Sequence, residues 1–191
     1  MVELQNYKKE MQEKYKNEID KFNTILLDVN SFARGEIMWD LLKSSLYVEK
    51  ELKYYLFLRW WNDIDAGHQY FRNKNIKVWI RAAKLNLIFK ELNFDSEGYA
   101  TVYRGENEYS RFYVDDAKNK NVYSWTTDKN IAMRFANGAR VRSRGRLNNM
   151  QILIGKVKKD DILAYLTDRN ENEVVCFNVI IDEIINLEEE K

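Results

Sequence analysis

The spacing of apolar residues changes about halfway along the chain, and this change constrains the fold more than any other feature of the sequence. Up to about residue 92, apolar side chains recur at steps of three and four, which places them on one face of an amphipathic helix. The first such series is Leu4, Tyr7, Met11, Tyr15, Ile19, Phe22 and Leu26. The pattern predicts helical segments over 3–28 and 36–92, with a break at "DIDAGH".

From Tyr99 onward, short segments rich in β-branched and aromatic residues replace the helical pattern. The segments "YATVYRG", "VYSWTT", "MQILIGKV" and "EVVCFNVII" are predicted to be strands. A helix is predicted over 128–137, with Asp128 as its N-cap and Gly138 placed to end it. We therefore expect an α+β fold, with a helical region over 1–95 and a β-rich core over 96–191 that together form one compact unit.

The composition excludes several classes of protein. The 31 basic and 30 acidic residues give a net charge of +1, so no overall charge attracts nucleic acid or anionic lipid. The single cysteine, Cys176, excludes an internal disulfide, and a single histidine, His68, disfavours a zinc site or a Ser-His-Asp triad. No apolar leader is visible, and the longest apolar runs are too short to cross a bilayer. We expect a metal-free protein of the cytoplasm, or of a host cytoplasm if the chain is a phage product.

Two acidic triplets raise the question of chemistry. Glu171 and Glu173 precede the apolar stretch "VVCF", and residues two apart in an extended chain project to the same side, roughly 6.5–7 Å apart. Paired acids at about that separation serve reactions at the anomeric carbon of a sugar. The similar pair Glu106 and Glu108 leads into "YSRFYVDD", which is not a clean strand, so only the second pair is expected to be anchored to a rigid element. Alternatively, both triplets are solvated turns.

Other polar residues occur in the predicted strands. Arg104 lies near the end of "TVYRG", and Ser124 and Thr126 occupy alternate positions of "VYSWTTD", so their hydroxyls face one way. An arginine in a strand must be solvated or paired. The Arg, the hydroxyl pair and the acid pair are hypothesised to converge on one cleft, where Arg104 holds a phosphate and an acid faces a sugar. The alternative is that each is an exposed strand position.

Taken in order, these motifs resemble the ADP-ribosyltransferase family, in its Arg–Ser–Glu branch of bacterial toxins and related phage and vertebrate enzymes. The matching segments are "VYRG", "YSWTTDKNIAMRFANG" and "ENEVVCF", and the resemblance covers about residues 99–182. It implies a split mixed or antiparallel β-sheet core that binds NAD, as a substrate, in a cleft.

The resemblance also implies roles for the strand residues. Arg104 would bind the phosphate and ribose of NAD, and the backbone of Gly105 would meet the nicotinamide amide. Ser124 would hold the catalytic acid and the nicotinamide side in place, and Thr126 would support the strand or its hydrogen bonds.

The two acids have different implied roles. Glu173 would be the catalytic acid, which bonds the ribose 2′-hydroxyl and stabilises positive charge as nicotinamide departs. Glu171 would select the acceptor, because in this family a Glu there goes with arginine acceptors. The resemblance implies transfer of ADP-ribose from NAD to an arginine of a target protein. Alternatives are NAD glycohydrolysis, transfer to a non-arginine acceptor such as a nucleic-acid base, or a non-catalytic binding or inhibitor protein on this fold.

A basic segment, "ARVRSRGRLNNM", is left with several interpretations. It spaces four arginines at steps of two: Arg140, Arg142, Arg144 and Arg146. They are expected to form a solvated basic loop, to contact the phosphates of NAD, or to meet an acidic partner protein or a nucleic-acid backbone.

Overall fold

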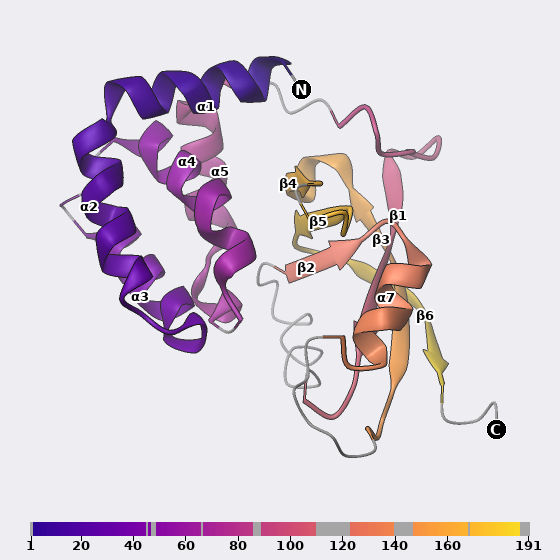
Figure 1. Ribbon diagram of the computed structural model, residues 1–191. Coiled ribbons are helices and arrows are strands. Elements are labelled where there is room, and N and C mark those ends of the chain that lie inside the picture. Colours follow the sequence, from indigo (N-terminus) through magenta and orange to yellow (C-terminus); the bar gives the residue numbers. More distant parts are fainter. Residues whose placement is uncertain are drawn as a thin grey trace. The chain divides into compact units, whose positions relative to one another are not determined.

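The computed structural model describes residues 2–44, 46, 49–65, 67–85, 89–109, 123–139, 147–167 and 169–187. The fold is α+β, with helices first and a sheet after them, as predicted (Figure 1). Two compact units make up the chain, Met1–Leu87 and Ile88–Lys191, where one was expected, and the division lies before the boundary expected at 95/96. In the part of the chain that the structure describes, no helix has both the length and the apolar character to cross a membrane.

The helical unit is built around α4. Its helices are α1 (Val2–Lys14), α2 (Lys16–Leu27), α3 (Ser31–Lys43), α4 (Lys50–Trp60) and α5 (Asn73–Ala82), with 3-10 turns η1 (Trp61–Asp63) and η2 (His68–Tyr70). A helix that is apolar on all sides belongs in a core, and α4 buries residues around its whole circumference: Leu52, Tyr54, Tyr55, Leu56, Phe57, Leu58 and Trp60. Helices α1 and α5 pack against it. The aromatic residues of α4 and the adjoining Trp61 are therefore core residues.

The helix boundaries differ from the sequence prediction in three places, the first being the end of α5 at Ala82 instead of near residue 92. The segment expected as one helix over 3–28 bends at Tyr15, where the hydroxyl donates to Glu51 of α4 at 2.9 Å. Helix α3 begins at Ser31 rather than at residue 36. It begins there because the side chain of Asn30 accepts hydrogen bonds from the N–H groups of Phe32 and Ala33, which makes Asn30 the N-cap.

Arg34 ties the corner between α2 and α3 together. Its guanidinium donates to three backbone carbonyls: Leu26 at 3.1 Å, Val29 at 2.8 Å and Asp63 at 2.8 Å. One of these acceptors, the carbonyl of Leu26, lies in the last turn of α2 and also accepts from the N–H of Val29 at 3.3 Å. A planar fork of N–H donors suits this arrangement better than an ammonium group would.

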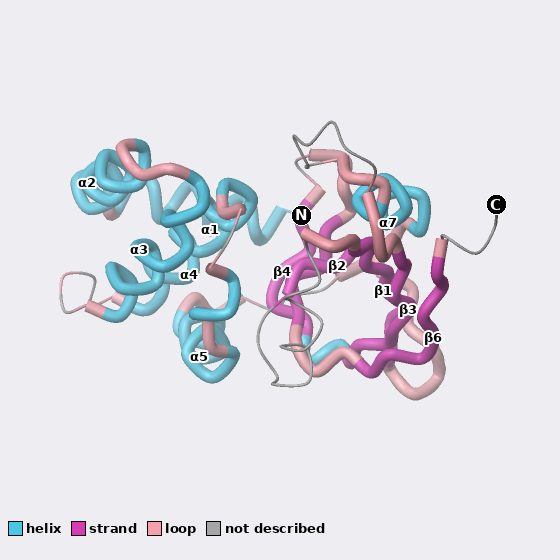
Figure 2. The backbone as a smooth tube through the Cα atoms, turned by 90° about the horizontal axis from the view of Figure 1, so that it is seen from below, coloured by secondary structure: helices cyan, strands magenta, loops and turns pink. Residues whose placement is uncertain are grey.

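The second unit holds the sheet. Its strands are β1 (Tyr99–Glu106), β2 (Tyr123–Thr126), β3 (Gln151–Lys158), β4 (Ile162–Leu166), β5 (Glu173–Cys176) and β6 (Ile180–Asn186). Among the described residues their order is β4-β5-β2-β1-β3-β6, and every pairing is antiparallel. Seen from below, the strands follow a strong curve (Figure 2). The segment "EVVCFNVII", predicted as one strand, forms both β5 and β6, because Asn178 between them adopts a left-handed φ of 54°.

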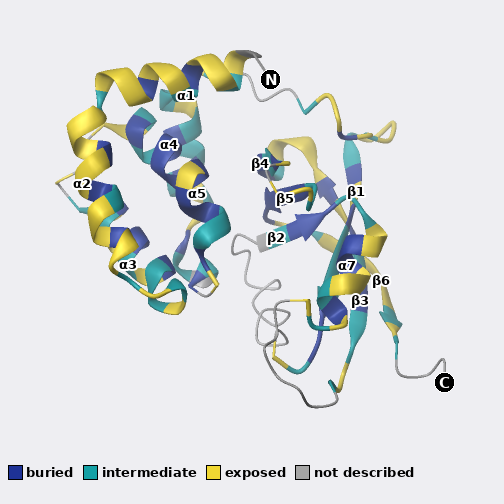
Figure 3. Cartoon of the chain, in the orientation of Figure 1, coloured by how far each residue is buried: buried dark blue, intermediate teal, exposed yellow. Residues whose placement is uncertain are grey.

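The two faces of the sheet are covered differently. One face carries the apolar core: Leu92, Ala100, Val102, Trp125, Leu153, Val157, Ile162, Val174 and Cys176. Helix α7 (Lys129–Ala136) packs against β1, on the face toward which Gly105 points. Its predicted ends are confirmed, since the side chain of Asp128 accepts from the N–H of Asn130 and Gly138 has a left-handed φ of 83°. Burial along the inner strands is visible in Figure 3.

Candidate active site

The pairing between β1 and β2 is short. Strand β1 pairs with β3 along its whole length, whereas within the described strands it is matched to β2 at a single pair, Tyr103 with Thr126. Arg104 is the first residue beyond that pair. Its Nη1 atom donates to the backbone carbonyl of Ser124 on β2 at 2.7 Å. The guanidinium therefore bridges the two strands where their ladder ends.

Glu106 is the second partner of this guanidinium. The Nε atom of Arg104 donates to Oε1 of Glu106 at 2.7 Å, which is a charge-assisted distance. The side chains are 16% and 1% exposed, so the ion pair is largely withdrawn from water. The other carboxylate oxygen of Glu106 accepts from Nε2 of Gln151 on β3, at 3.4 Å. Sequence reasoning missed this partner of Arg104.

The predicted hydroxyls and the predicted catalytic acid share one face. Thr126 lies directly opposite Glu173, and Ser124 lies directly opposite Val175. Opposed residues of antiparallel strands project to the same side, and so do residues two apart in one strand. Ser124, Thr126 and Glu173 therefore face the same way. Glu173 is 6% exposed and lies between Thr126 and Leu166, its opposed residue on β4.

Arg104 reaches this group from the other side of the sheet. Its opposed residue on β3 is Leu153, which belongs to the apolar core together with Trp125. The structure thus joins Arg104 to Ser124 through the backbone of β2 and not through a shared face. Trp125, the residue after Ser124, has a buried indole N–H with no hydrogen-bond partner among the described residues.

Glu171 lies in a turn, and the geometry expected for the acid pair is wrong. Asn170 and Asn172 have left-handed φ values of 54° and 46°, so the chain is not extended between Glu171 and Glu173. Strand β5 begins at Glu173 itself. Two β2-side contacts hold the turn: the Thr126 hydroxyl donates to the Glu171 carbonyl at 2.7 Å, and the N–H of Thr127 donates to the carbonyl of Asn172 at 3.2 Å. Glu171 is half-buried.

Gly105 is where α7 approaches β1. A Cβ built at this position would overlap the carbonyl oxygen of Ala132 and lie 2.6 Å from the backbone nitrogen of Ala136. A glycine is therefore required by packing, whatever else its backbone contacts. This close approach places α7 directly behind the strand that carries Arg104.

The first acidic triplet is anchored, contrary to the expectation that only the second would be. Glu106 is the last residue of β1, and Asn107 is 2% exposed. The Asn107 side chain donates to the carbonyls of Phe135 and Ala136 at 3.3 and 3.2 Å, so it caps the end of α7. Strand parity was the available signal, since Glu106 falls on the buried face of Ala100 and Val102.

Comparison of the chain with protein-family models, with curated proteins and with solved structures finds no match. The site therefore stands on its geometry and on the chemistry of its residues.

Two other sequence features are placed by the structure. Cys176 is buried in β5, and that burial raises the pKa of its thiol. The ring of His68 lies edge-on to Trp61, with centroids 4.7 Å apart. Among the described residues, no group of three or more His, Cys, Asp or Glu side chains is arranged to hold a metal ion. The four arginines at 140, 142, 144 and 146 lie outside the described residues.

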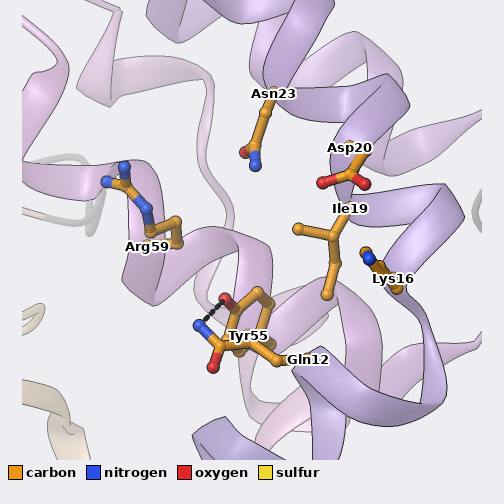
Figure 4. Close-up of a pocket in the computed structure, with 7 residues that line it drawn as sticks. All are labelled: Gln12, Lys16, Ile19, Asp20, Asn23, Tyr55 and Arg59. Carbon is orange, nitrogen blue, oxygen red and sulfur yellow. Dashed lines mark hydrogen bonds between the residues drawn. The ribbon is translucent and has the colours of Figure 1, made fainter.

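The helical unit has a cavity of its own, of about 310 Å³, between α1, α2 and α4 (Figure 4). It is lined by Gln12, Lys16, Ile19, Asp20, Asn23, Tyr55 and Arg59. Gln12 Nε2 donates to the Tyr55 hydroxyl at 3.1 Å, and Asn23 Oδ1 accepts from Trp60 Nε1 at 2.9 Å. These amides are thus engaged in joining the helices to each other.

Proposed function

We propose that the chain transfers ADP-ribose from NAD to an arginine of a protein. The observation that carries the proposal is that the buried residue Glu173 shares one face with Ser124 and Thr126, while Arg104, from the other face, donates to the backbone carbonyl of Ser124. These are the residues that the resemblance to ADP-ribosyltransferases selects, and they come from three separate strands.

The chemistry suits such a set. The bond from ribose C1′ to the nicotinamide nitrogen breaks, its electron pair leaves with nicotinamide, and C1′ becomes positively charged. A carboxylate that is 6% exposed stabilises that charge more strongly than a hydrated one, because water screens it less. Removing one such preorganised group typically costs about 10²–10³-fold in rate.

The second half of the reaction concerns the acceptor. A guanidine nitrogen of the target arginine bonds to C1′ and then loses a proton, and we assign the acceptance of that proton to Glu171. Thr126 holds the turn through the backbone carbonyl of Glu171 and not through the Glu171 side chain.

The test is incubation of the purified chain with labelled NAD and a cell lysate. Glu173→Gln is run beside it, and the control is Glu183→Gln, which makes the same change at an exposed position of β6. Label in a protein band, with release of nicotinamide, is expected for the intact chain and for Glu183→Gln but not for Glu173→Gln. Nicotinamide release without labelled protein would mean glycohydrolysis. Neither product, with a folded chain, would overturn the proposal in favour of a binding protein.

A further inference from the structure

The carboxylate of Glu106 holds the arginine on which the proposed site depends. We propose that Glu106 is a positioning residue: it fixes the Arg104 guanidinium where the pairing of β1 with β2 ends, and so fixes the direction in which Arg104 meets NAD. The inference rests on the proposed function, since positioning has meaning only if NAD binds there.

The contacts around Arg104 leave it little rotational freedom. Nε is bonded to Glu106 and Nη1 to the carbonyl of Ser124, both at 2.7 Å. A guanidinium is planar, so two bonds on different nitrogens fix both its position and the orientation of its plane. Without the bond to Nε, the guanidinium could pivot about its contact with Ser124.

Glu106 is itself held by its surroundings. It ends the long pairing of β1 with β3, opposite Gln151, whose side chain donates to it. The next residue, Asn107, is fixed to the end of α7, and the N–H of Glu108 donates to the carbonyl of Asn148 at 3.0 Å. The carboxylate is therefore attached to a strand that pairs with β3 along its whole length, which suits a group that must hold another in place.

The charges explain why a carboxylate occupies this position. A cation that is 16% exposed needs a partner, and a carboxylate that is 1% exposed needs one still more. Because the pair is neutral, Glu106 weakens the electrostatic attraction between Arg104 and a phosphate. What it supplies in return is a fixed direction for the donors of the guanidinium.

The test compares Glu106→Gln with Glu108→Gln, which makes the same change two residues later in the same triplet, at a position that contacts Asn148 and not Arg104. In Glu106→Gln, the KM for NAD is expected to rise about tenfold with kcat within twofold, because a neutral amide holds Nε less strongly. Glu108→Gln is expected to match the intact chain. In an Arg104→Lys background, Glu106→Gln is expected to raise the KM for NAD by less than a further twofold.

Glu106→Asp keeps the negative charge on a shorter side chain, and its KM for NAD provides the test if Glu106→Gln does not fold. A raised KM in the folded Asp variant supports positioning, whereas a KM like that of the intact chain shows that charge balance alone is required and overturns the inference. An unchanged KM in folded Glu106→Gln also overturns it. If the intact chain neither binds nor turns over NAD, the proposed function fails, and this inference fails with it.

Discussion

The hydroxyl of Thr126 donates a 2.7 Å hydrogen bond to the backbone carbonyl of Glu171. The hydroxyl oxygen of Thr126 also accepts a hydrogen bond from the N–H of Asp128 at 3.1 Å. One side chain, only 5% exposed, thus joins β2 to the acidic turn before β5 and to the N-terminus of α7. Thr126 was expected to support its strand, and its side chain also holds the turn that carries Glu171.

Replacing Thr126 with valine should therefore loosen the turn. Valine has almost the same shape but leaves the Glu171 carbonyl and the Asp128 N–H without this partner. We expect a loss of about 1–3 kcal/mol in the free energy of unfolding, measured by urea denaturation. Thr126→Ser keeps the hydroxyl and should lose much less. If valine and serine destabilise the chain equally, the hydrogen bonds are not what Thr126 contributes.

Much of this arrangement follows from local sequence rules. Alternation along "VYSWTT" places Ser124 and Thr126 on one face, and the cap and stop residues of α7 can be identified from Asp128 and Gly138. The apolar spacing of the first half indicates helices, although it placed the start of α3 at residue 36 and the helix begins at Ser31. Such features depend on neighbours within a few positions, which is why they could be predicted.

The features that sequence did not reveal depend on pairing across the sheet. No spacing rule states that β1 is matched to β2 only at Tyr103, and a longer pairing would leave Arg104 no reason to bond a backbone carbonyl twenty residues away. The two glutamates of "ENE" were also expected to lie on an extended chain, and the positive φ values of Asn170 and Asn172 show that they do not. Asparagine tolerates that conformation better than most residues, so this signal was present but not decisive.

Glu171→Gln should separate transfer from hydrolysis. The change removes the charge that would orient a guanidine and accept its proton, while the backbone carbonyl of residue 171 still accepts from Thr126. We expect labelling of protein to fall by about 10²-fold or more and nicotinamide release to stay within a few-fold. Glu97→Gln, exposed in the turn before β1, is the matched control. Equal loss of both products would place Glu171 in the first half of the reaction instead.

Gly105→Ala should be among the most damaging single substitutions in the sheet unit. The added methyl group would overlap the backbone of α7 at Ala132, and backbone atoms cannot turn aside as a side chain can. Overpacking of this kind costs about 1–3 kcal/mol and sometimes more. Thermal denaturation should show a lower Tm, with Thr101→Ala, at an exposed position of the same strand, nearly unchanged. An Ala variant as stable as the native chain would mean that α7 moves off β1 readily.

The titration of Cys176 should lower the free energy of unfolding at alkaline pH. Burial raises the pKa of its thiol well above the ordinary value of 9.0, with the nearby Asp161 carboxylate adding to that effect and Arg104 opposing it. Below about pH 8 the thiol is protonated in both the folded and the unfolded chain, so its contribution to stability is constant. Above that pH the unfolded chain loses the proton first, which favours unfolding.

The size of this effect follows from the difference in protonation. At pH 10 the folded chain should have lost on the order of 1 kcal/mol relative to pH 8 through this one group. Cys176→Ala removes the titration while retaining Tyr7 and Tyr54, whose pKa values burial also raises. Urea denaturation of both proteins at pH 8, 9 and 10 should therefore show a difference in free energy of unfolding that shrinks as pH rises. A difference independent of pH would mean that water reaches the thiol in β5.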